Sequence, residues 1–387
     1  MKRLLTLVLR AVAALCVLVP FANTPARAND APMSEAIWFY LGTYTGPKSK
    51  GIYLVRLDSA TGKLDQPALV IEEKNASFLA LHPTRPFLYA VCELQGGGSV
   101  VAYEIDSVSR TLKRLNSQPS GGNGPCFVSV DGTGRCVMTA NYSSAEVASF
   151  CIKGDGSVGE KVSGDKHEGT GPIASRQQHA FAHSILPDPS NRYAISCDLG
   201  ADSLYVYKLN PQAGTLTAGD PPFHKLSPGD GPRHIAFSPD GDHAYVVNEL
   251  GNSVTALAWD SDLGQLKTLQ TLPTMEKTPE TYTEEEKAAE ILVHPTGKYV
   301  YASNRGEDTI VIYGVQPDHT LKTLGRISTD GKGPRSFGID PTGRFLVAAN
   351  ERSDSLTAYS IDIDTGLLKT TSHHHGIGRP VCVRFCK

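Results

Sequence analysis

Charged and imidazole side chains recur at two fixed positions of a pattern that repeats along this chain. The pattern is a β-rich run, a turn of the Pro-Asx/Thr-Gly type, and a second β-rich run that ends in Asn or Asp. One position lies six residues before each turn and the other ten residues after it. The first set is Ser77, Cys126, His183, Arg233, Ala289 and Arg335, and the second is Glu93, Tyr142, Leu199, Glu249, Arg305 and Glu351. Such guanidinium, imidazole and carboxylate groups could bind an anion and transfer protons.

Hydrolysis of a lactone or a similar cyclic ester is a reaction that these groups could carry out. Arg233 and Arg305 could hold an anionic group or a developing oxyanion with their forked donors. Glu249 or His183 could act as general base toward water and then as acid toward the leaving alkoxide. Further substrate contacts are predicted at Arg335, Glu351, Asn248, Asn304, Asn141, Tyr142, Glu290 and Asp198.

The same residues also have a structural interpretation. Asn and Asp at strand ends often cap turns by bonding to nearby backbone groups. The arginines and glutamates could form ion pairs that brace neighbouring repeats, and His183 could be a hydrogen-bonded wall residue. His234 is expected on the opposite side of its strand from Arg233, inside the packing between repeats. The histidines near turns, which are expected to face solvent, are His82, His243 and His294.

Short antiparallel strands are the elements that would position these residues. Spacings of 49, 57, 50, 56 and 46 residues separate the turn positions Pro83, Gly132, Pro189, Pro239, Pro295 and Pro341. Repeats of this length are typical of β-propeller blades. Alternating runs such as 204–208 and 299–303, rich in β-branched and aromatic residues, indicate strands. Because the first strand of a blade starts where the second one ends, both sets are expected around one mouth of a central channel.

A seventh blade is predicted from the two ends of the chain. Segments 38–46 and 51–57 resemble second and third strands with no first strand before them. Segment 376–385 resembles the opening of the other blades. Pairing of this C-terminal strand with the N-terminal strands would close the ring and remove two exposed sheet edges. The predicted fold is therefore an all-β, seven-bladed β-propeller that forms a single domain over residues 29–387.

Residues 1–28 are predicted to be a secretory signal peptide. They have a basic start, an apolar stretch from Ala11 to Phe21 that is short for a membrane span, and a small-x-small sequence ending at Ala28. Cleavage is expected after Ala28, and a single N-terminal anchor is the alternative. The mature protein is expected to be exported to the periplasm or the extracellular space.

The overall composition excludes some classes of partner. The chain is 40% hydrophobic and 20% charged, contains 37 glycines and carries a net charge of −3. This charge argues against a general surface for nucleic acid or for an anionic membrane. A monomer with a small-molecule substrate is expected, with no membrane contact beyond the export signal.

The cysteines and clustered histidines show no spacing typical of metal ligands. Seven cysteines follow the predicted cleavage site, and most are expected to be buried small side chains. Cys126 and Cys136 could face each other across one hairpin, whereas Cys382 and Cys386 are too far apart along a strand to bond. The run 373–375 of three histidines is predicted to be an exposed turn. No metal and no cofactor are expected.

A polar segment, 278–289, precedes the first strand of the fifth blade. It is predicted to make a short helical excursion over the same mouth. There it could be a lid over the site or an inert surface loop.

Several ordered motifs resemble those of the seven-bladed lactonase family, which contains propeller-type 6-phosphogluconolactonases and fungal carboxymuconate-lactonising enzymes. The motifs are Gly-Pro-Cys126 with Asn141-Tyr142, Ala182-His183-Ser184 with Asp198, Gly-Pro-Arg233-His with Asn248-Glu249, Ala289-Glu290 with Asn304-Arg305-Gly, and Gly-Pro-Arg335 with Asn350-Glu351. The resemblance extends from Trp38 to the C-terminus. It implies a metal-independent lactonase of carbohydrate metabolism, resembling the 6-phosphogluconolactonases, whose active site comprises His183, Arg233, Glu249 and Arg305.

Two differences from the family pattern affect which substrate is expected. The predicted cellular location also affects it. Related sequences often have His where Phe127 and Phe181 stand here. The substrate of a 6-phosphogluconolactonase arises in the cytosol, so an exported protein would act on a non-phosphorylated aldonolactone or a related ester. The alternatives are a non-enzymatic propeller that binds a ligand or protein, and a carboxymuconate-type cyclase, because one fold supports many functions.

Overall fold

The described residues form seven four-stranded antiparallel sheets. The computed structural model describes residues 36–94, 96–276, 283 and 285–386. The predicted signal segment 1–28 and half of the polar segment 278–289 lie outside these residues, and from Lys287 onward that segment is strand rather than helix. Within the described part of the chain, the one helical element is the 3-10 helix η2 (Glu351–Ser353), and no helix there has the length and apolar character needed to span a membrane.

Each sheet is one blade, and its strands follow one another from the inside of the ring outward. Blade 1 contains β4 (Ala76–Leu81), β5 (Phe87–Leu94), β6 (Gly97–Ile105) and β7 (Leu112–Pro119). Blade 2 contains β8 (Pro125–Val130), β9 (Cys136–Asn141), β10 (Glu146–Ile152) and β11 (Val158–Lys166). Blade 3 contains β12 (Ala182–Pro187), β13 (Tyr193–Asp198), β14 (Ser203–Asn210) and β15 (Thr215–Lys225). Blade 4 contains β16 (Pro232–Phe237), β17 (His243–Asn248), β18 (Ser253–Asp260) and β19 (Gln265–Pro273). Blade 5 contains β20 (Lys287–Val293), β21 (Tyr299–Arg305), β22 (Thr309–Val315) and β23 (Leu321–Ser328). Blade 6 contains β24 (Pro334–Ile339), β25 (Phe345–Asn350), β26 (Ser355–Ile361) and β27 (Leu368–His375). Blade 7 contains β28 (Pro380–Phe385), β1 (Ala36–Thr43), β2 (Gly51–Asp58) and β3 (Ala68–Glu72).

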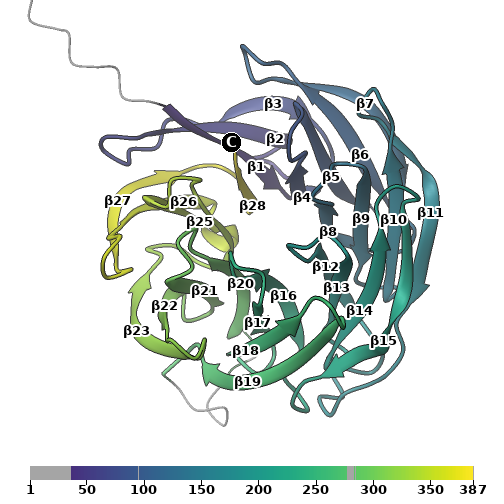
Figure 1. The fold of residues 1–387 in the computed structure, drawn as a ribbon. Coiled ribbons are helices and arrows are strands. Elements are labelled where there is room, and N and C mark those ends of the chain that lie inside the picture. The colour runs from purple at the N-terminus through teal and green to yellow at the C-terminus, as the bar shows by residue number, and fades with distance from the viewer. Residues whose placement is uncertain (1–35, 95, 277–282, 284, 387) are drawn as a thin grey trace, which may run out of the picture. The chain divides into compact units, whose positions relative to one another are not determined.

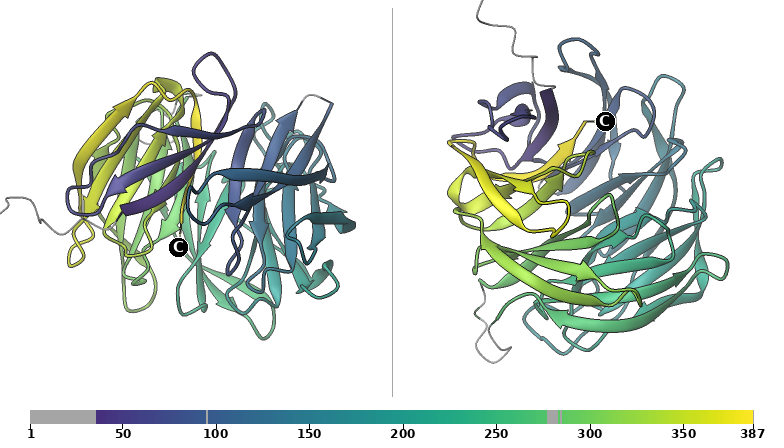
Figure 2. Two further views of the ribbon diagram at one scale, coloured as in Figure 1. Left: turned by 90° about the horizontal axis from the view of Figure 1, so that it is seen from above. Right: turned by 60° about the vertical axis from the view of Figure 1, so that its left-hand side comes forward.

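Blade 7 joins the two ends of the described chain. Its inner strand β28 pairs antiparallel with β1, from Phe39 opposite Phe385 to Thr43 opposite Pro380. In Figure 1 the yellow β28 lies beside the purple β1, and the inner strands of all blades surround the centre of the ring. Figure 2 shows the twisted blades standing side by side around that ring. The predicted seven-bladed propeller and its closure by the C-terminal strand are confirmed.

Apolar side chains on both faces of the blades hold the ring together. The second strands β9 and β13 are buried along their whole length, because each face packs against a neighbouring blade. The outermost strand β15, in contrast, has only one buried residue, Leu216, near its start. Since burial of one large apolar side chain contributes about 1.5–3 kcal/mol, this packing fixes the positions of the inner-strand ends.

Every inner strand carries one extra residue near its beginning. In β16, Pro232 lies opposite Asn248 and His234 opposite Val247, so Arg233 has no partner in the ladder. The other residues at such irregularities are Ser77, Cys126, His183, Ala289 with Glu290, Arg335 and Val381. A β-bulge re-aims side chains and is common next to active sites. Except for blade 7, the bulges coincide with the position six residues before each turn.

The bulge in β16 overturns the expectation for His234. Arg233 and His234 both line one small cavity between the inner strands, and the His234 ring centroid lies 5.2 Å from that of His183. The prediction that His234 lies within the packing between blades assumed strict alternation along the strand. It was wrong because a bulge interrupts that alternation.

The cysteines do not pair as the sequence suggested. Cys136 lies opposite Cys151 in the ladder of β9 and β10, whereas Cys126 is the bulged residue of β8. Cys126 and Cys136, which the sequence allowed to face each other, are therefore not opposite one another. All seven cysteines in the described residues are free.

The structure also contradicts three predictions about where histidines lie. His82 and His294 are buried rather than solvent-facing, and each lies near a glycine carbonyl of the next blade. His82 Nε2 is 3.0 Å from Gly134 O, and His294 Nε2 is 2.8 Å from Gly343 O. The run 373–375 belongs to strand β27 and is not a turn.

Candidate active site

Charged side chains surround a cavity of about 290 Å³ at one end of the central channel, which we call the mouth cavity. Both predicted sets contribute to its lining. The residues from these sets are Cys126, His183, Arg335, Glu93, Tyr142, Glu249 and Arg305. The structure thus brings together side chains from six blades at the end where the first strand of each blade begins.

Glu249 is the centre of a cluster of ion pairs. Its Oε2 accepts hydrogen bonds from Arg233 Nε at 3.1 Å and Arg305 Nη2 at 2.8 Å, and its Oε1 accepts one from Arg176 Nη2 at 2.8 Å. The residue is only 4% exposed. Burial would raise the pKa of this carboxyl, but the charges of Arg305, Arg233 and Arg176 outweigh it and hold the pKa well below its usual value. Glu249 is therefore ionised, and both of its oxygens are occupied.

Arg233 and Arg305 are also held by backbone carbonyls. Arg233 Nη1 donates to Ala289 O at 2.6 Å, and Arg305 Nη2 donates to Ala288 O at 3.1 Å. Burial, together with the neighbouring cations, lowers the pKa of Arg233 to about 10 and also lowers the pKa of Arg305. Both side chains remain charged at neutral pH. Three guanidinium groups around one carboxylate leave an excess of positive charge.

Arg176 is a site residue that the repeat does not predict. It lies in the connection between β11 and β12, and its Nη2 is also 3.4 Å from Tyr142 OH. Its Nη1 is buried and has no hydrogen-bond partner among the residues that the structure describes. The interval of 57 residues between Gly132 and Pro189 is the longest between turns, and this extra length is the signal that could have indicated it.

The neighbouring Gln177 anchors this connection against blade 3. Its Nε2 donates to Leu199 O at 2.9 Å and to Asp202 Oδ1 at 2.7 Å, and it is fully buried. Arg176 is therefore presented to Glu249 by an anchored loop rather than by a strand.

His183 differs from Glu249 because its ring has no oxygen or nitrogen hydrogen-bond partner among the described residues. The one contact to its ring nitrogens in the described residues is long, with Cys126 Sγ 3.9 Å from His183 Nδ1. The ring is edge-on to Tyr142 at 5.4 Å between centroids, and the residue is 5% exposed. Burial and then the charge of Arg233 lower the pKa of His183 well below its usual value. His183 is a neutral imidazole that lines the cavity.

A second polar layer beneath the mouth cavity supports Arg233. Arg233 Nη1 is 3.2 Å from His234 Nε2, His234 Nδ1 is 2.6 Å from Glu290 Oε1, and Ser336 Oγ donates to Glu290 Oε2 at 3.2 Å. Burial lowers the pKa of His234 to about 4, so the neutral ring donates to Glu290 and accepts from Arg233. Glu290, predicted to contact substrate, lies in this deeper layer and does not line the mouth cavity.

The Asn and Asp residues at strand ends also lie outside the mouth cavity. Asn248 Nδ2 donates to Ser253 Oγ and to Thr255 Oγ1, each at 2.9 Å, and Asp198 Oδ2 is 2.8 Å from His167 Nδ1. The residues predicted to contact substrate that are fully buried and do not line the mouth cavity are Asn141, Asn248, Asn304 and Asp198. Each precedes a site position by one residue, and successive residues of a strand point to opposite sides.

Arg335 and Glu351 occupy the other side of the mouth. Arg335 Nη2 lies 3.3 Å from Tyr44 OH, which donates to Glu93 Oε1 at 2.8 Å. Glu351 accepts from Arg379 Nη2 at 2.8 Å and is 4.0 Å from Arg335 Nη1. Glu351 lines an adjoining hollow of about 590 Å³, whereas Arg335 lines the mouth cavity itself.

The other end of the channel has a different character. A hollow of about 550 Å³, called here the opposite hollow, is lined mainly by apolar residues. These include Phe127, Leu186, Phe237, Ile339 and Phe385. The polar side chains in its lining are His234 and Glu290 of the deeper layer, and Arg384. The concentration of charge is thus confined to the mouth cavity.

Seven blades with a charged cavity at one end of the channel define this chain as a β-propeller with a site on its axis. A family model described as "Lactonase, 7-bladed beta-propeller" matches residues 38–385, and the chain belongs to this family. The predicted family and the predicted class of enzyme, a lactonase, are confirmed at this level.

Named relatives cover nearly the whole chain. The 6-phosphogluconolactonase of Bacillus subtilis (strain 168) is 39% identical over 347 residues, which are 89% of this chain and 97% of that protein. The solved structure of a periplasmic gluconolactonase from Pseudomonas aeruginosa has 32% identity and a TM-score of 0.84, and the match covers 91% of this chain and 99% of that one. A putative 6-phosphogluconolactonase from Bacteroides fragilis NCTC 9343 has the same identity of 32% and a TM-score of 0.84, with coverage of 93% and 100%.

Proposed function

We propose that this protein hydrolyses a sugar lactone in the mouth cavity. The observation that carries the proposal is the combination of a neutral His183, whose Nδ1 has only a long contact with Cys126 Sγ, and three arginines around the single carboxylate of Glu249. The imidazole suits proton transfer, and the excess positive charge suits an oxyanion. Relatives named as lactonases support the same class of reaction.

His183 is proposed as the general base. Glu249 is less suited to this role because arginines occupy both oxygens and lower the pKa of the carboxyl. As a water molecule forms a bond to the lactone carbonyl carbon, its proton would pass to His183. The resulting imidazolium would then protonate the ring oxygen as the ring C–O bond breaks, which gives the free hydroxy acid and restores neutral His183.

Arg176 and Arg305 are proposed to bind the oxyanion that forms at the carbonyl. The buried Nη1 of Arg176 has no partner among the described residues, and an unsatisfied buried donor costs about 1–3 kcal/mol. A substrate oxygen would satisfy it. In this arrangement Glu249 acts as a positioning residue, because it holds three guanidinium groups together against their mutual repulsion.

We further propose that the protein is exported and that its substrate is a non-phosphorylated aldonolactone. The signal features of residues 1–28 support export, and a relative with 32% identity is named a periplasmic gluconolactonase. N-terminal sequencing of the protein from fractionated cells tests this proposal. A mature chain in the exported fraction that begins at Asn29 is the expected result, and a cytosolic chain that retains residues 1–28 would contradict it.

The reaction is tested with purified, EDTA-treated protein and three substrates. Acid release is followed at constant pH with gluconolactone and its 6-phosphate, and a carboxymuconate is tested for ring closure. We expect hydrolysis of gluconolactone well above its spontaneous rate, without added metal. Turnover of the phosphorylated lactone alone would contradict the assignment of the substrate, and ring closure of the muconate would favour a cyclase. Lactone binding without turnover would favour a non-enzymatic propeller.

A further inference from the structure

Neighbouring blades share a repeated contact at the end of the strands opposite the mouth cavity. There, an aromatic residue at the start of a second strand lies against a glycine in the outer turn of the next blade. The pairs are Phe87 with Gly156, Tyr193 with Gly264, Tyr299 with Gly366, and Phe345 with Gly62. All four glycines have positive φ, and a Cβ atom on Gly264 would lie 2.4 Å from the Tyr193 ring. The repeat therefore uses glycine here both for its backbone conformation and for its lack of a side chain.

Blades 4 and 5 replace this contact with two histidines. His243 stands at the aromatic position in β17, and His319 stands at the glycine position in the turn between β22 and β23. Their rings are stacked, with centroids 3.5 Å apart and planes within 4° of each other. His319 keeps the positive φ of the repeat, at 60°, although this conformation is unfavourable for a residue with a side chain. Both members of the standard contact are thus exchanged together.

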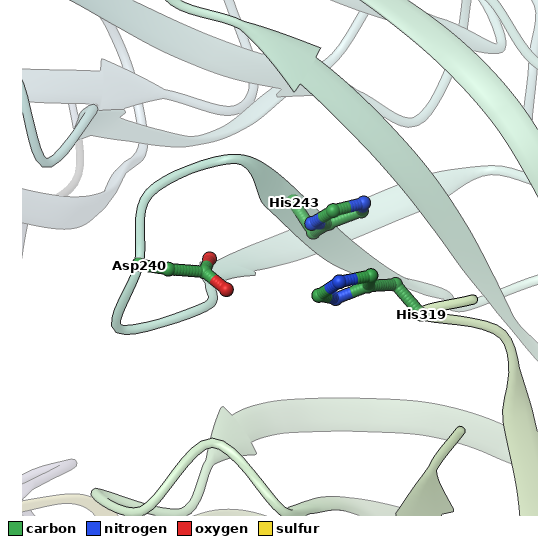
Figure 3. Close-up of side chains that lie close together, drawn as sticks. All are labelled: Asp240, His243 and His319. Carbon is green, nitrogen blue, oxygen red and sulfur yellow. The ribbon is translucent and has the colours of Figure 1, made fainter. Parts of the chain in front are cut away.

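Asp240 adds a carboxylate to the same place. It lies in the turn between β16 and β17, and Figure 3 shows its carboxylate close to the two stacked rings. The ligand atoms of Asp240, His243 and His319 all lie within 4.8 Å of one another. Ser238 Oγ and Asp242 N both bond to Asp240 Oδ1, which fixes the carboxylate. His243 Nδ1 is buried and has no hydrogen-bond partner in the described part of the chain.

We propose that Asp240, His243 and His319 bind one transition-metal ion, with Zn²⁺ as the expected type. Two imidazole nitrogens and one carboxylate oxygen form a donor set that suits zinc, copper or nickel better than magnesium or calcium. Asp240 is exposed and both histidines are partly exposed, so an ion can enter from solvent. Its binding would require the two stacked rings to turn toward it, because the nitrogen lone pairs lie in the ring planes. Three protein ligands leave a further coordination position for water.

The proposed ion would link a turn of blade 4 to a turn of blade 5. Its place is at the opposite end of the strands from Glu249, because turns between first and second strands and between third and fourth strands lie away from the mouth. The site would therefore stabilise the contact between two blades in place of aromatic packing. Lactone hydrolysis in the mouth cavity would not require it.

Calorimetric titration of the metal-stripped protein with Zn²⁺ alone tests this site. All samples carry His374→Ser and His375→Ser, which remove competing binding by the histidine run in β27. We expect one bound Zn²⁺ per chain and a Zn²⁺-dependent rise in Tm. His319→Gly restores the residue that the four blades described above have at this turn, so it should fold normally.

In the His319→Gly variant the affinity for Zn²⁺ should fall at least about tenfold, because even loss of an outer-shell partner lowers metal affinity about 10- to 100-fold. His243→Phe restores the aromatic partner and should have the same effect. His224→Ser, at a partly exposed histidine in β15, is the matched control and should bind Zn²⁺ as before. Equal affinity in the His319→Gly variant and its parent, or no saturable binding in the parent, would overturn the proposal. Loss of lactonase turnover in His319→Gly would contradict the separation of the two sites.

Discussion

The mouth cavity and the opposite hollow are made by the same inner strands, yet charged side chains are concentrated at only one of them. At the mouth, a bulge removes one residue of each strand from the ladder, and His183, Arg233 and Arg335 project from such positions. Toward the opposite hollow the strands are regular and contribute apolar residues such as Leu186 and Phe237. A bulge therefore frees one residue from the packing that the rest of the strand must satisfy, and the side chain of that residue can then take part in binding or catalysis.

The largest effect is expected from His183→Asn, which removes the proposed base while keeping a polar side chain. Without the imidazole, kcat/KM for gluconolactone should fall about 10²- to 10⁴-fold, the usual contribution of general acid–base catalysis. Acid release at constant pH measures the rate, and circular dichroism checks the fold. A folded variant with the turnover of the parent protein would remove His183 from the chemistry.

Glu249→Gln should chiefly lower the free energy of unfolding, because it disrupts the ion pairs at the mouth. The substitution leaves three guanidinium groups around a neutral amide, and loss of one partner of a buried ion pair costs about 3–5 kcal/mol. Urea unfolding measures this cost. The control is Glu276→Gln, because Glu276 is 82% exposed and pairs with Arg326 at the surface, where an ion pair contributes about 1 kcal/mol or less. Equal destabilisation by both substitutions would show that the cluster does not hold the mouth together.

The layer beneath the mouth predicts a dependence of stability on pH. Burial lowers the pKa of His234 to about 4 in the folded protein, whereas the unfolded chain binds this proton near the usual value of 6.5. A lowered folded pKa means that the stability is present above pH 6.5 and is lost as the pH falls toward 4. His234 alone should therefore lower the free energy of unfolding by about 1.4 kcal/mol for each unit that the pH falls within this window.

His234→Gln tests that dependence by urea unfolding at pH 7 and pH 5. The decline between the two pH values should be smaller in this variant than in the parent protein. His375→Gln, at a residue in β27, is the control and should keep the decline of the parent. An unchanged decline in His234→Gln would assign the acid sensitivity to other groups.

The smallest effect is expected in the opposite hollow. Ile339→Val removes one methyl group from its wall, which should cost about 0.5–1.5 kcal/mol of stability. The kcat for gluconolactone should not change, because Ile339 lies away from the mouth cavity. Thermal unfolding and the rate assay measure the two quantities. A loss of kcat in a stable variant would remove the functional contrast between the two ends.

Much of this architecture could be predicted because the repeat specifies it locally. Turn spacing and strand alternation predicted the blades, and the incomplete pattern at both ends predicted that β28 pairs with β1. The same register brought His183, Glu249 and Arg305 to one cavity. Each of these features depends on a short segment, and the local sequence of that segment is enough to determine its geometry.

The remaining features depend on departures from the regular strand and on contacts between distant segments. The bulge at Arg233 placed His234 in the channel, which strict alternation could not predict. Arg176 comes from a connection whose length, but not its path, is visible in the sequence. The cluster of Asp240, His243 and His319 joins two blades, so no local spacing indicates it.

The most direct test of the central claim is a crystal structure of the protein with gluconate, the product of the proposed reaction. The account predicts gluconate in the mouth cavity, with its carboxylate within hydrogen-bonding distance of Arg176 or Arg305 and beside His183. Gluconate bound in the opposite hollow, or bound with His183 turned away from it, would contradict the account.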